Sequence, residues 1–166
     1  MIRDATITDL PALTQIYNQA VLATTATFDI DEQSPEQHRL WFDHHGGKYP
    51  LIVAEKDGRV VGYSTLSPYR SKPAYSLTVE SSVYVDSAFH GQGIGRELMR
   101  GALRRASAGG FHAVLAGITG GNEASARLHI ALGFRHVGQL REVGRKFGTW
   151  QDVHFYELIL EDMGQA

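Results

Sequence analysis

The stretch that most constrains the fold is a predicted strand followed closely by a glycine-rich turn and a predicted helix. Thr78–Val85 is rich in β-branched and aromatic side chains, which is typical of a strand. Gly91–Gly95 then carries glycine at every second position. Beyond the turn, apolar residues recur at helical spacing, namely Ile94, Leu98, Met99, Ala102 and Leu103. The sequence therefore predicts a helix that begins inside the glycines.

A helix that begins at this place would form an anion-binding site. The first turn of a helix leaves about four N–H groups unpaired, and its partial positive charge attracts anions. Glycines let a phosphate approach the backbone, and Arg96 adds a guanidinium suited to phosphate oxygens. The alternative is that the glycines serve only a tight connection. Two familiar phosphate loops do not fit, because the chain has no G-x-x-x-x-G-K-[ST] and its glycines are spaced G-x-G-x-G instead of G-x-G-x-x-G.

The composition limits the class of protein. The chain has 166 residues, 43% of them hydrophobic, which predicts one domain over residues 1–166 with a buried core. A net charge of -2 makes nucleic acid an unexpected partner. No apolar run approaches the roughly 20 residues of a membrane span, and Met1–Asp4 opens a segment without an apolar signal region, so we expect a cytoplasmic protein. Without cysteine, disulfides and thiolate chemistry are excluded.

The order of the remaining elements predicts an α/β sandwich with a mixed sheet. Strands are expected at Ile2–Ala5, Leu51–Glu55, Val60–Ser64, Thr78–Val85, His112–Ile118, Phe134–Leu140 and Val153–Leu160. Helices are expected after a cap at Thr8 or Asp9, from Ser34, from the glycines and over Glu123–Leu132. Asp57-Gly58 predicts a hairpin turn. Loops are expected at 24–31, at 67–74 and around Lys146, Phe147, Gly148 and Trp150.

Two consequences follow from this order. A parallel crossover should join Thr78–Val85 to His112–Ile118, and ligands of such sheets bind beyond the carboxyl ends of the strands, where the glycine turn lies. The adjacent His44 and His45 are interpreted as solvated residues at a helix end and not as metal ligands, because adjacent side chains point apart on a helix.

The glycine turn resembles the acyl-CoA-binding signature of the GCN5-related N-acetyltransferases (GNAT), [RQ]-x-x-G-x-[GA] after a strand. The matching stretch is His90–Gly95, in which His90 stands where the signature has Arg or Gln. Longer segments resemble the phosphinothricin and methionine sulfoximine acetyltransferases within this superfamily, namely Ala74–Val85, Asn122, Arg127–Phe134 and Gly144–Val153. The resemblance implies the GNAT fold, with a mixed sheet of about six to seven strands and about four helices. It also implies acetyl-CoA as co-substrate, no metal and a homodimer.

Acetyl transfer from a thioester to an amine needs a base for the amine and an acid for the leaving thiolate. The resemblance assigns the base to Glu80, in the strand before the glycine turn. The alternative is a carboxylate on a solvated strand face. His129 holds the position where many GNAT enzymes have a tyrosine that protonates CoA sulfur, and an imidazole can do the same work. A helix histidine that covers the core is the alternative.

The resemblance also implies the residues that bind acetyl-CoA. Asn122 matches an asparagine that hydrogen-bonds pantetheine, and the backbone of one strand should pair with pantetheine amides as a peptide would. The expected cofactor-binding residues are Val83, Tyr84, Val85, Gly91, Gln92, Gly93, Ile94, Gly95, Arg96 and Asn122.

An amino acid with a second polar head needs cations for its oxygens and apolar walls for its stem. Arg70, Tyr75, Lys146 and Trp150 offer both, with Arg70 on the substrate carboxylate. Lys146 and Trp150 would come from the facing subunit if the chain dimerises as its relatives do. Each of the four is alternatively a surface residue. Ser76 stands where some relatives carry Arg or Asp, which leaves the substrate open.

The function expected from these residues is acetyl transfer from acetyl-CoA to the α-amine of phosphinothricin, methionine sulfoximine or a similar small amino acid. One alternative is acetylation of another small amine, such as a polyamine, or of a peptide N-terminus. The other is a non-catalytic acyl-CoA sensor, which would have no use for a base at Glu80.

Overall fold

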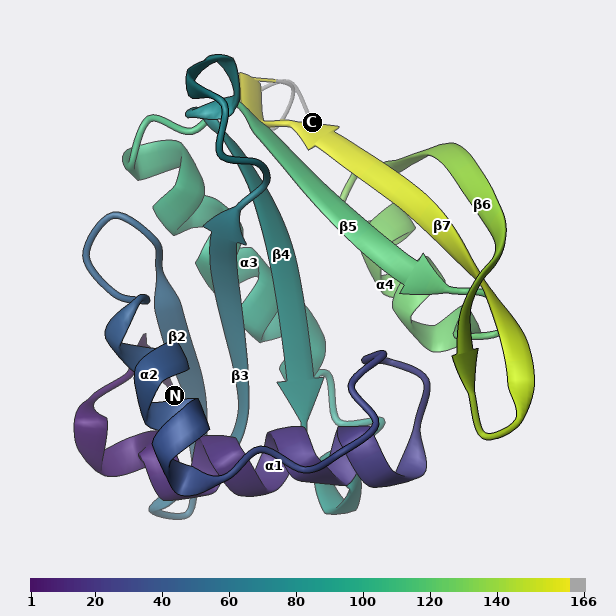
Figure 1. The fold of residues 1–166 in the computed structure, drawn as a ribbon. Helices are drawn as coiled ribbons and strands as arrows, with labels where there is room; N and C mark the ends of the chain where they lie inside the picture. Colours follow the sequence, from purple (N-terminus) through teal and green to yellow (C-terminus); the bar gives the residue numbers. More distant parts are fainter. Residues whose placement is uncertain (162–166) are drawn as a thin grey trace.

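A computed structural model describes residues 1–161 of the chain. It contains a mixed sheet of seven strands in the order β1-β2-β3-β4-β5-β7-β6, flanked by four α-helices (Figure 1). The strands are β1 (Ile2–Asp4), β2 (Leu51–Lys56), β3 (Arg59–Pro68), β4 (Thr78–Val85), β5 (Ala113–Thr119), β6 (Arg135–Lys146) and β7 (Thr149–Ile159). The helices are α1 (Leu10–Ala23), α2 (Pro35–Asp43), α3 (Ile94–Ala108) and α4 (Glu123–Ala131). The predicted α/β fold with a mixed sheet is confirmed.

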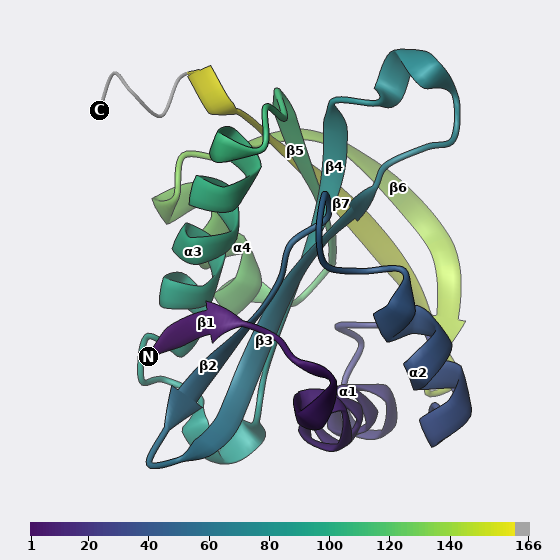
Figure 2. The same ribbon diagram turned by 90° about the vertical axis from the view of Figure 1, so that its left-hand side faces the viewer.

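The helices cover both faces of the sheet. Figure 2 shows α3 and α4 on one side of the strands and α1 and α2 on the other. Side chains alternate between the faces along a strand, so in β2 Ile52 packs in the cluster under α3, whereas Leu51 and Val53 pack with Leu13 and Ile16 of α1. The apolar stripe predicted for α3 is buried as expected, with Leu98 and its neighbours at the centre of the larger cluster.

Strands β4 and β5 form the predicted parallel pair, but they stay together over only part of their length. Their ladder runs through Thr78–Ala113, Val79–Val114 and Glu80–Leu115. Beyond these pairs the two strands diverge, while β5 remains paired with β7 along its whole length (Figure 1). The divergence leaves backbone groups of β4 and β5 facing each other across an opening immediately after Glu80.

The β6–β7 hairpin differs from its prediction. Strand pairing continues through Lys146 and Thr149, so the predicted loop is a two-residue turn at Phe147-Gly148. Both turn residues have positive φ, 53° and 72°, as hairpin turns of this length favour. The full length of these strands could not be predicted from the sequence, for two reasons. Phenylalanine seldom occupies a turn position with positive φ. Register shifts at His136/Gly138 and Leu140/Gly144 also interrupt the alternation of apolar and polar side chains along β6.

The start of α1 also differs. A short 3-10 turn, Ile7–Asp9, precedes the helix and has Thr6 as its N-cap. Asp9 is at the N-cap position of α1, as predicted, but its side chain makes no capping hydrogen bond there. The Asp9 carboxylate accepts hydrogen bonds from the Thr6 backbone N–H and from Arg3, which lowers the pKa of Asp9. The Asp9 carboxylate therefore fastens β1 to the start of the helix through Arg3 and is not used to cap α1.

Within residues 1–161 the structure has no helix with the length and apolar character needed to cross a membrane. The cytoplasmic location stays a prediction.

Candidate active site

The opening between β4 and β5 continues into a cavity of about 640 Å³ that reaches α1, the glycine turn and α4. Its walls include all but one of the residues predicted to bind the cofactor, namely Val83, Tyr84, Val85, Gly91, Gly93, Ile94, Gly95, Arg96 and Asn122. Gln92 is the exception, because its side chain turns outward and accepts a hydrogen bond from Lys56 Nζ at 2.7 Å. We call this cavity the cleft.

The glycine turn is open on the side of the cleft. Gly91 and Gly93 have φ of 75° and 79°, in the left-handed region that favours glycine, and a Cβ added to either would meet no atom within 4 Å. Gly93 is the N-cap of α3, so the N–H groups of the first helical turn lie beside this open space. The local geometry is therefore suited to an anion.

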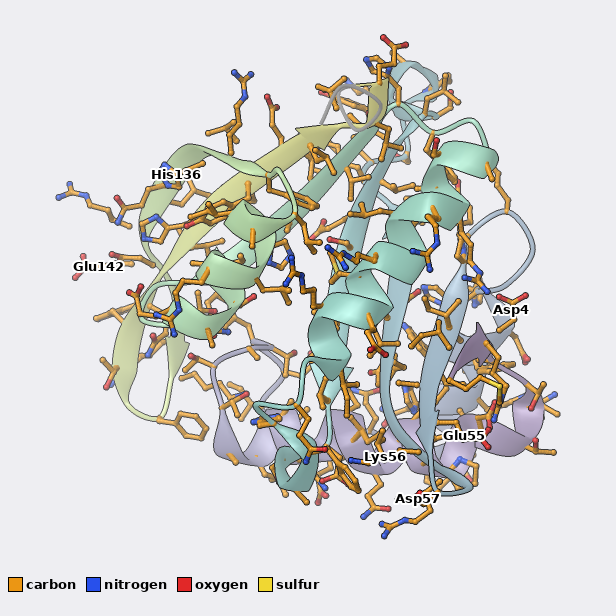
Figure 3. All side chains as sticks on the ribbon, turned by 180° about the vertical axis from the view of Figure 1, so that it is seen from behind. Asp4, Glu55, Lys56, Asp57, His136 and Glu142 are labelled. Atoms are coloured by element: carbon orange, nitrogen blue, oxygen red, sulfur yellow. The ribbon has the colours of Figure 1, made fainter. Side chains whose placement is uncertain are left out.

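His90, which departs from the expected Arg or Gln, has a structural role here. Its Nε2 donates to the backbone oxygen of Val85, 2.8 Å away, and so closes the turn against the end of β4. Sequence reasoning missed Lys56 as a neighbour of the turn. Figure 3 shows it at the end of the β2–β3 hairpin beside the turn, and its Nζ lies 5.8 Å from the centre of the Phe89 ring.

Glu80 is the last residue of β4 to pair with β5, so it lies where the two strands separate. Its side chain shares a face of the sheet with Ser82 and Tyr84, and a Cβ added to Gly117 on β5 would lie 4.0 Å from Glu80 Oε1. Gly117 and Ser82 both line the cleft. More than a third of the side-chain surface is open to solvent, yet the surrounding protein partly desolvates the carboxylate and raises the pKa of Glu80.

His129 of α4 lines the cleft, although only 3% of its surface is exposed. Its Nδ1 lies 2.8 Å from the backbone oxygen of Ser125. A carbonyl oxygen can only accept, so Nδ1 carries the proton and Nε2 of the neutral ring has a lone pair. Burial lowers the pKa of His129, while the bond to Ser125 opposes the shift. The free protein therefore holds a neutral imidazole here, which would need a further proton before it could act as an acid.

Asn122 lines the cleft and caps α4, with Oδ1 accepting from the Ser125 N–H at 3.3 Å. The oxygen keeps one further lone pair, while the amide Nδ2 makes no hydrogen bond within residues 1–161 and offers two N–H donors to a ligand. Asn122 was predicted to hydrogen-bond pantetheine. The cap orients the side chain and leaves Nδ2 as the donor that could do so.

The four predicted substrate residues fall into two groups. Arg70 and Tyr75 lie in the loop before β4, at the same end of the strand as Glu80, and both pack against Tyr69. Lys146 and Trp150 lie at the tip of the β6–β7 hairpin, where Trp150 is 57% exposed. None of the four lines the cleft.

Lys146 is not the surface residue that the sequence allowed. It is 3% exposed, and its Nζ donates to the backbone oxygen of Thr27 at 2.9 Å. Thr119 on β5 reaches the same loop through a 2.6 Å hydrogen bond to the oxygen of Thr25. These bonds fasten the loop between α1 and α2, which we call the α1–α2 loop (residues 24–34), across the end of the cleft.

Sequence reasoning also missed a second, smaller cavity. It has a volume of about 190 Å³, and its walls are Tyr17, Asp29, Gln33, His38, Trp41, Tyr63, Thr65, Ser67, Ser82 and Tyr84. We call it the recess. Ser82 and Tyr84 line both the recess and the cleft. The alternation of Tyr63, Thr65 and Ser67 along β3 was the one available signal, since it places polar groups on the inner face of a strand.

The interpretation of the paired histidines is half wrong. His44 is exposed, as predicted. His45 is partly buried against Trp41, with ring centres 4.5 Å apart, and Nε2 lies 2.9 Å from Ser67 Oγ. The tertiary fold brings β3 under the end of α2, which a helical pattern alone does not reveal.

Comparison with known proteins agrees with this geometry. Residues 13–134 match the sequence family described as Acetyltransferase (GNAT) family. A phosphinothricin N-acetyltransferase of Streptomyces coelicolor is 48% identical over 153 residues, covering 90% of each chain. An L-methionine sulfoximine/L-methionine sulfone acetyltransferase of Pseudomonas aeruginosa is 41% identical over 167 residues, covering 99% of this chain and 97% of that one.

The solved structures add the fold. The crystal structure of a GNAT superfamily phosphinothricin acetyltransferase from Sinorhizobium meliloti in complex with acetyl-CoA superposes with a TM-score of 0.93 at 36% identity, covering 96% of this chain and 87% of that one. An N-acetyltransferase from Staphylococcus aureus gives a TM-score of 0.94 at 40% identity, covering 96% and 98%. The predicted resemblance is thus confirmed: the chain belongs to the GNAT family and is an acetyl-CoA-dependent N-acetyltransferase.

Proposed function

We propose that the protein transfers the acetyl group of acetyl-CoA directly to the α-amine of a small amino acid such as phosphinothricin or methionine sulfoximine, with Glu80 as general base. The observation that carries the proposal is the position of Glu80, at the point where β4 and β5 separate beside a cleft that begins at an anion-binding turn. The named activities of relatives at 41–48% identity support the choice of acceptor.

Acetyl-CoA would lie along the cleft. Its pyrophosphate would meet the N–H groups of the glycine turn and the guanidinium of Arg96, a charge-assisted contact. The pantetheine amides would pair with β4 at Val83–Val85, which β5 has left, and Asn122 would donate from Nδ2. This arrangement directs the thioester toward Glu80 and Gly117.

The reaction exchanges a C–S bond for a C–N bond. The acceptor arrives as an ammonium, so one proton must leave before its nitrogen attacks the thioester carbonyl, and a second leaves as the amide forms. Glu80 accepts a proton directly or through water, and a raised pKa makes its carboxylate a stronger base than an ordinary glutamate. The CoA thiolate takes up one proton as it departs. His129 would supply that proton only if it were charged, and its lowered pKa opposes this.

The acceptor would enter from the Glu80 end of β4. Arg70 in the loop before β4 would bind its carboxylate, and Tyr75 would form part of the wall. Lys146 would not contact the acceptor but would hold the α1–α2 loop in place through its hydrogen bond to Thr27. Trp150 would join the site of a second subunit in a homodimer.

A CoA-release assay across a panel of acceptors tests the proposal. The panel contains phosphinothricin, methionine sulfoximine, methionine sulfone, a polyamine and a short peptide. We expect turnover with the amino acids and little with the polyamine or the peptide. Turnover only with the polyamine or peptide would contradict the acceptor class. Tight acetyl-CoA binding without turnover on any acceptor would instead support a sensor.

A further inference from the structure

The recess lies beside Glu80 on the same face of the sheet. In the β3–β4 ladder, Tyr63 pairs with Tyr84, Thr65 with Ser82, and Ser67 with Glu80. The first two pairs and Ser67 line the recess. The recess and the proposed site of proton transfer are therefore neighbouring parts of one surface, joined through Ser82 and Tyr84, which also line the cleft.

His38 presents a hydrogen-bond acceptor to the recess. Its Nδ1 lies 2.6 Å from Thr14 Oγ1, and that hydroxyl also lies 2.8 Å from the backbone oxygen of Leu10. The hydroxyl has one proton, which the Leu10 carbonyl must receive, so His38 Nδ1 must donate to Thr14. Nε2 then holds a lone pair, and burial keeps the ring neutral by lowering the pKa of His38 to about 4.

Ser67 is a second acceptor, for a similar reason. His45 Nδ1 lies 2.8 Å from the backbone oxygen of Trp41 and must donate to it, so His45 Nε2 accepts from Ser67 Oγ. The single proton of Ser67 is thereby used, and only its lone pairs remain for a ligand. His38 in α2 and His45 just after it thus determine that His38 Nε2 and Ser67 Oγ act as hydrogen-bond acceptors in the recess.

Tyr63 supplies the complementary group. Among residues 1–161, its hydroxyl and His38 Nε2 have no hydrogen-bond partner, although the two side chains are only 1% and 3% exposed. Within this range, every fully buried side-chain nitrogen or oxygen has a hydrogen-bond partner. The Tyr63 hydroxyl and His38 Nε2 have none, so each must border open space. The recess is the cavity that both residues line. A buried hydroxyl can donate or accept, and leaving it unpaired is costly.

Within the described part of the chain, Asp29 is the only acidic side chain in the walls of the recess, and its negative charge disfavours an anionic ligand there. The carboxylate of Asp29 accepts from the hydroxyl of Tyr17 and from Gln33. The ammonium of Lys146 interacts electrostatically with Asp29, whose charge opposes the fall in the pKa of Lys146 caused by burial. A neutral polar group is thus favoured there over an anion.

From this geometry we propose that the recess binds the terminal group of the acceptor's side chain, and that it selects a small neutral group carrying both an N–H donor and an oxygen acceptor. The N–H would donate to His38 Nε2 or Ser67 Oγ, and the oxygen would accept from the Tyr63 hydroxyl. Sulfoximines and carboxamides have this chemistry. Sulfones, carboxylates and phosphinates have only acceptors, so methionine sulfone and phosphinothricin would still be acetylated, but with a higher KM than methionine sulfoximine. This inference rests on the proposed function and specifies its substrate class.

Methionine sulfoximine and methionine sulfone give a sharp test, because they have nearly the same shape and differ in one N–H. We expect the wild-type KM for the sulfone to exceed that for the sulfoximine by about 2- to 10-fold, the value of one hydrogen bond, with similar kcat. Glutamine should likewise be preferred to glutamate. Equal KM values for the isosteric pair would overturn the inference and leave the recess as a space for water. Acetylation of neither compound would instead count against the proposed function.

Two variants locate the discrimination. His38→Phe keeps the stacked ring but removes the lone pair, so the ratio of the two KM values should fall toward 1. Tyr63→Phe should raise both KM values together, because both compounds carry the oxygen. His44→Phe, at an exposed histidine immediately after α2, is the matched control and should leave the ratio unchanged. A ratio that survives His38→Phe in a protein with wild-type circular dichroism would remove His38 from the site.

Discussion

At the scale of single residues, the position of Glu80 matters more than its type. A strand glutamate is usually a solvated surface group, and Glu80 does remain partly open to water. What distinguishes it is that β5 leaves β4 immediately after it and that Gly117, two residues beyond its partner Leu115, has no side chain to fill the space beside its carboxylate. Partial burial then raises its pKa.

The variant Glu80→Gln keeps the shape of the side chain and removes its basicity. We expect turnover at neutral pH to fall by about 10²–10⁴-fold, with unchanged affinity for acetyl-CoA. The wild-type rate should decline as the pH falls through the raised pKa of Glu80, because only the ionised form accepts a proton. The variant should lack this decline and recover partly at high pH.

Isothermal titration with acetyl-CoA and a pH series of CoA release provide the measurements. Glu142→Gln is the control, since Glu142 is exposed on β6 and points away from the molecule in Figure 3. Wild-type rates for Glu80→Gln at every pH would mean that another group accepts the proton.

His129 offers a pH test of the opposite sign. A general acid must be protonated, so a rate that needed His129 as an acid would fall as the pH rises through the lowered pKa of this residue. Because its Nδ1 proton is held by Ser125 and Nε2 is a lone pair, we expect no such fall below pH ~6.5, where the lowered pKa lies. His129→Gln should cost less than about 10-fold in kcat, below the usual contribution of an acid. A falling rate that disappears in His129→Gln would restore the acid role.

At the scale of elements, the glycine turn and the first turn of α3 can bind a phosphate only if no side chain fills the space beside their backbone. Gly93→Val would place a branched side chain at φ 79°, in space that is now empty. We expect acetyl-CoA affinity to fall strongly by calorimetry. Gly110→Val is a matched control, because Gly110 has φ 77°, equally empty surroundings and no place in the cleft wall.

Both glycine variants should lose a similar amount of stability, of the order of 1–2 kcal/mol for left-handed backbone, and both should be measured by thermal unfolding. Affinity that falls equally in the two variants would indicate general damage and contradict a phosphate-binding role for the turn.

The α1–α2 loop is an element whose position depends on one buried cation. Lys146→Met removes the hydrogen bond to Thr27 while keeping an unbranched side chain. We expect faster amide hydrogen exchange in residues 24–31 and a higher KM for acetyl-CoA, because Thr24 and Ala26 of this loop line the cleft. Arg145→Met, on the exposed preceding residue, is the control. Exchange rates that match the wild type would show that Lys146 does not hold the loop.

At the scale of the whole molecule, the β6–β7 hairpin carries an unusual number of exposed apolar side chains. They are Val137, Leu140, Val143, Phe147 and Trp150, each between 47% and 59% exposed. A contiguous apolar patch marks an interaction site, and we predict that these side chains of one hairpin form such a patch. We expect light scattering to show a homodimer and Trp150→Glu to shift it toward monomer. Leu40→Glu, at a 63% exposed position on α2, should leave the dimer intact. A wild-type monomer at every concentration would exclude this proposal and with it a Trp150 shared between subunits.

The sequence by itself determined the features that depend on neighbouring residues. β-branched residues gave β4 its observed bounds, the glycines placed the start of α3, and Asp57-Gly58 made the β2–β3 hairpin, because each depends on local backbone preferences. The same local segments carried the resemblance that the family match confirmed.

Only the tertiary structure decided the features made by residues far apart in the chain. The bond from Lys146 to Thr27 spans 119 positions, and the recess joins α1, α2, β3 and β4 through side chains whose proton directions follow from contacts that no sequence period encodes. β4 and β5 separate after Glu80 because β5 stays paired with β7 instead of following β4. Local preferences fix the elements, whereas burial and hydrogen bonding between distant elements decide which side chains meet and in which protonation state.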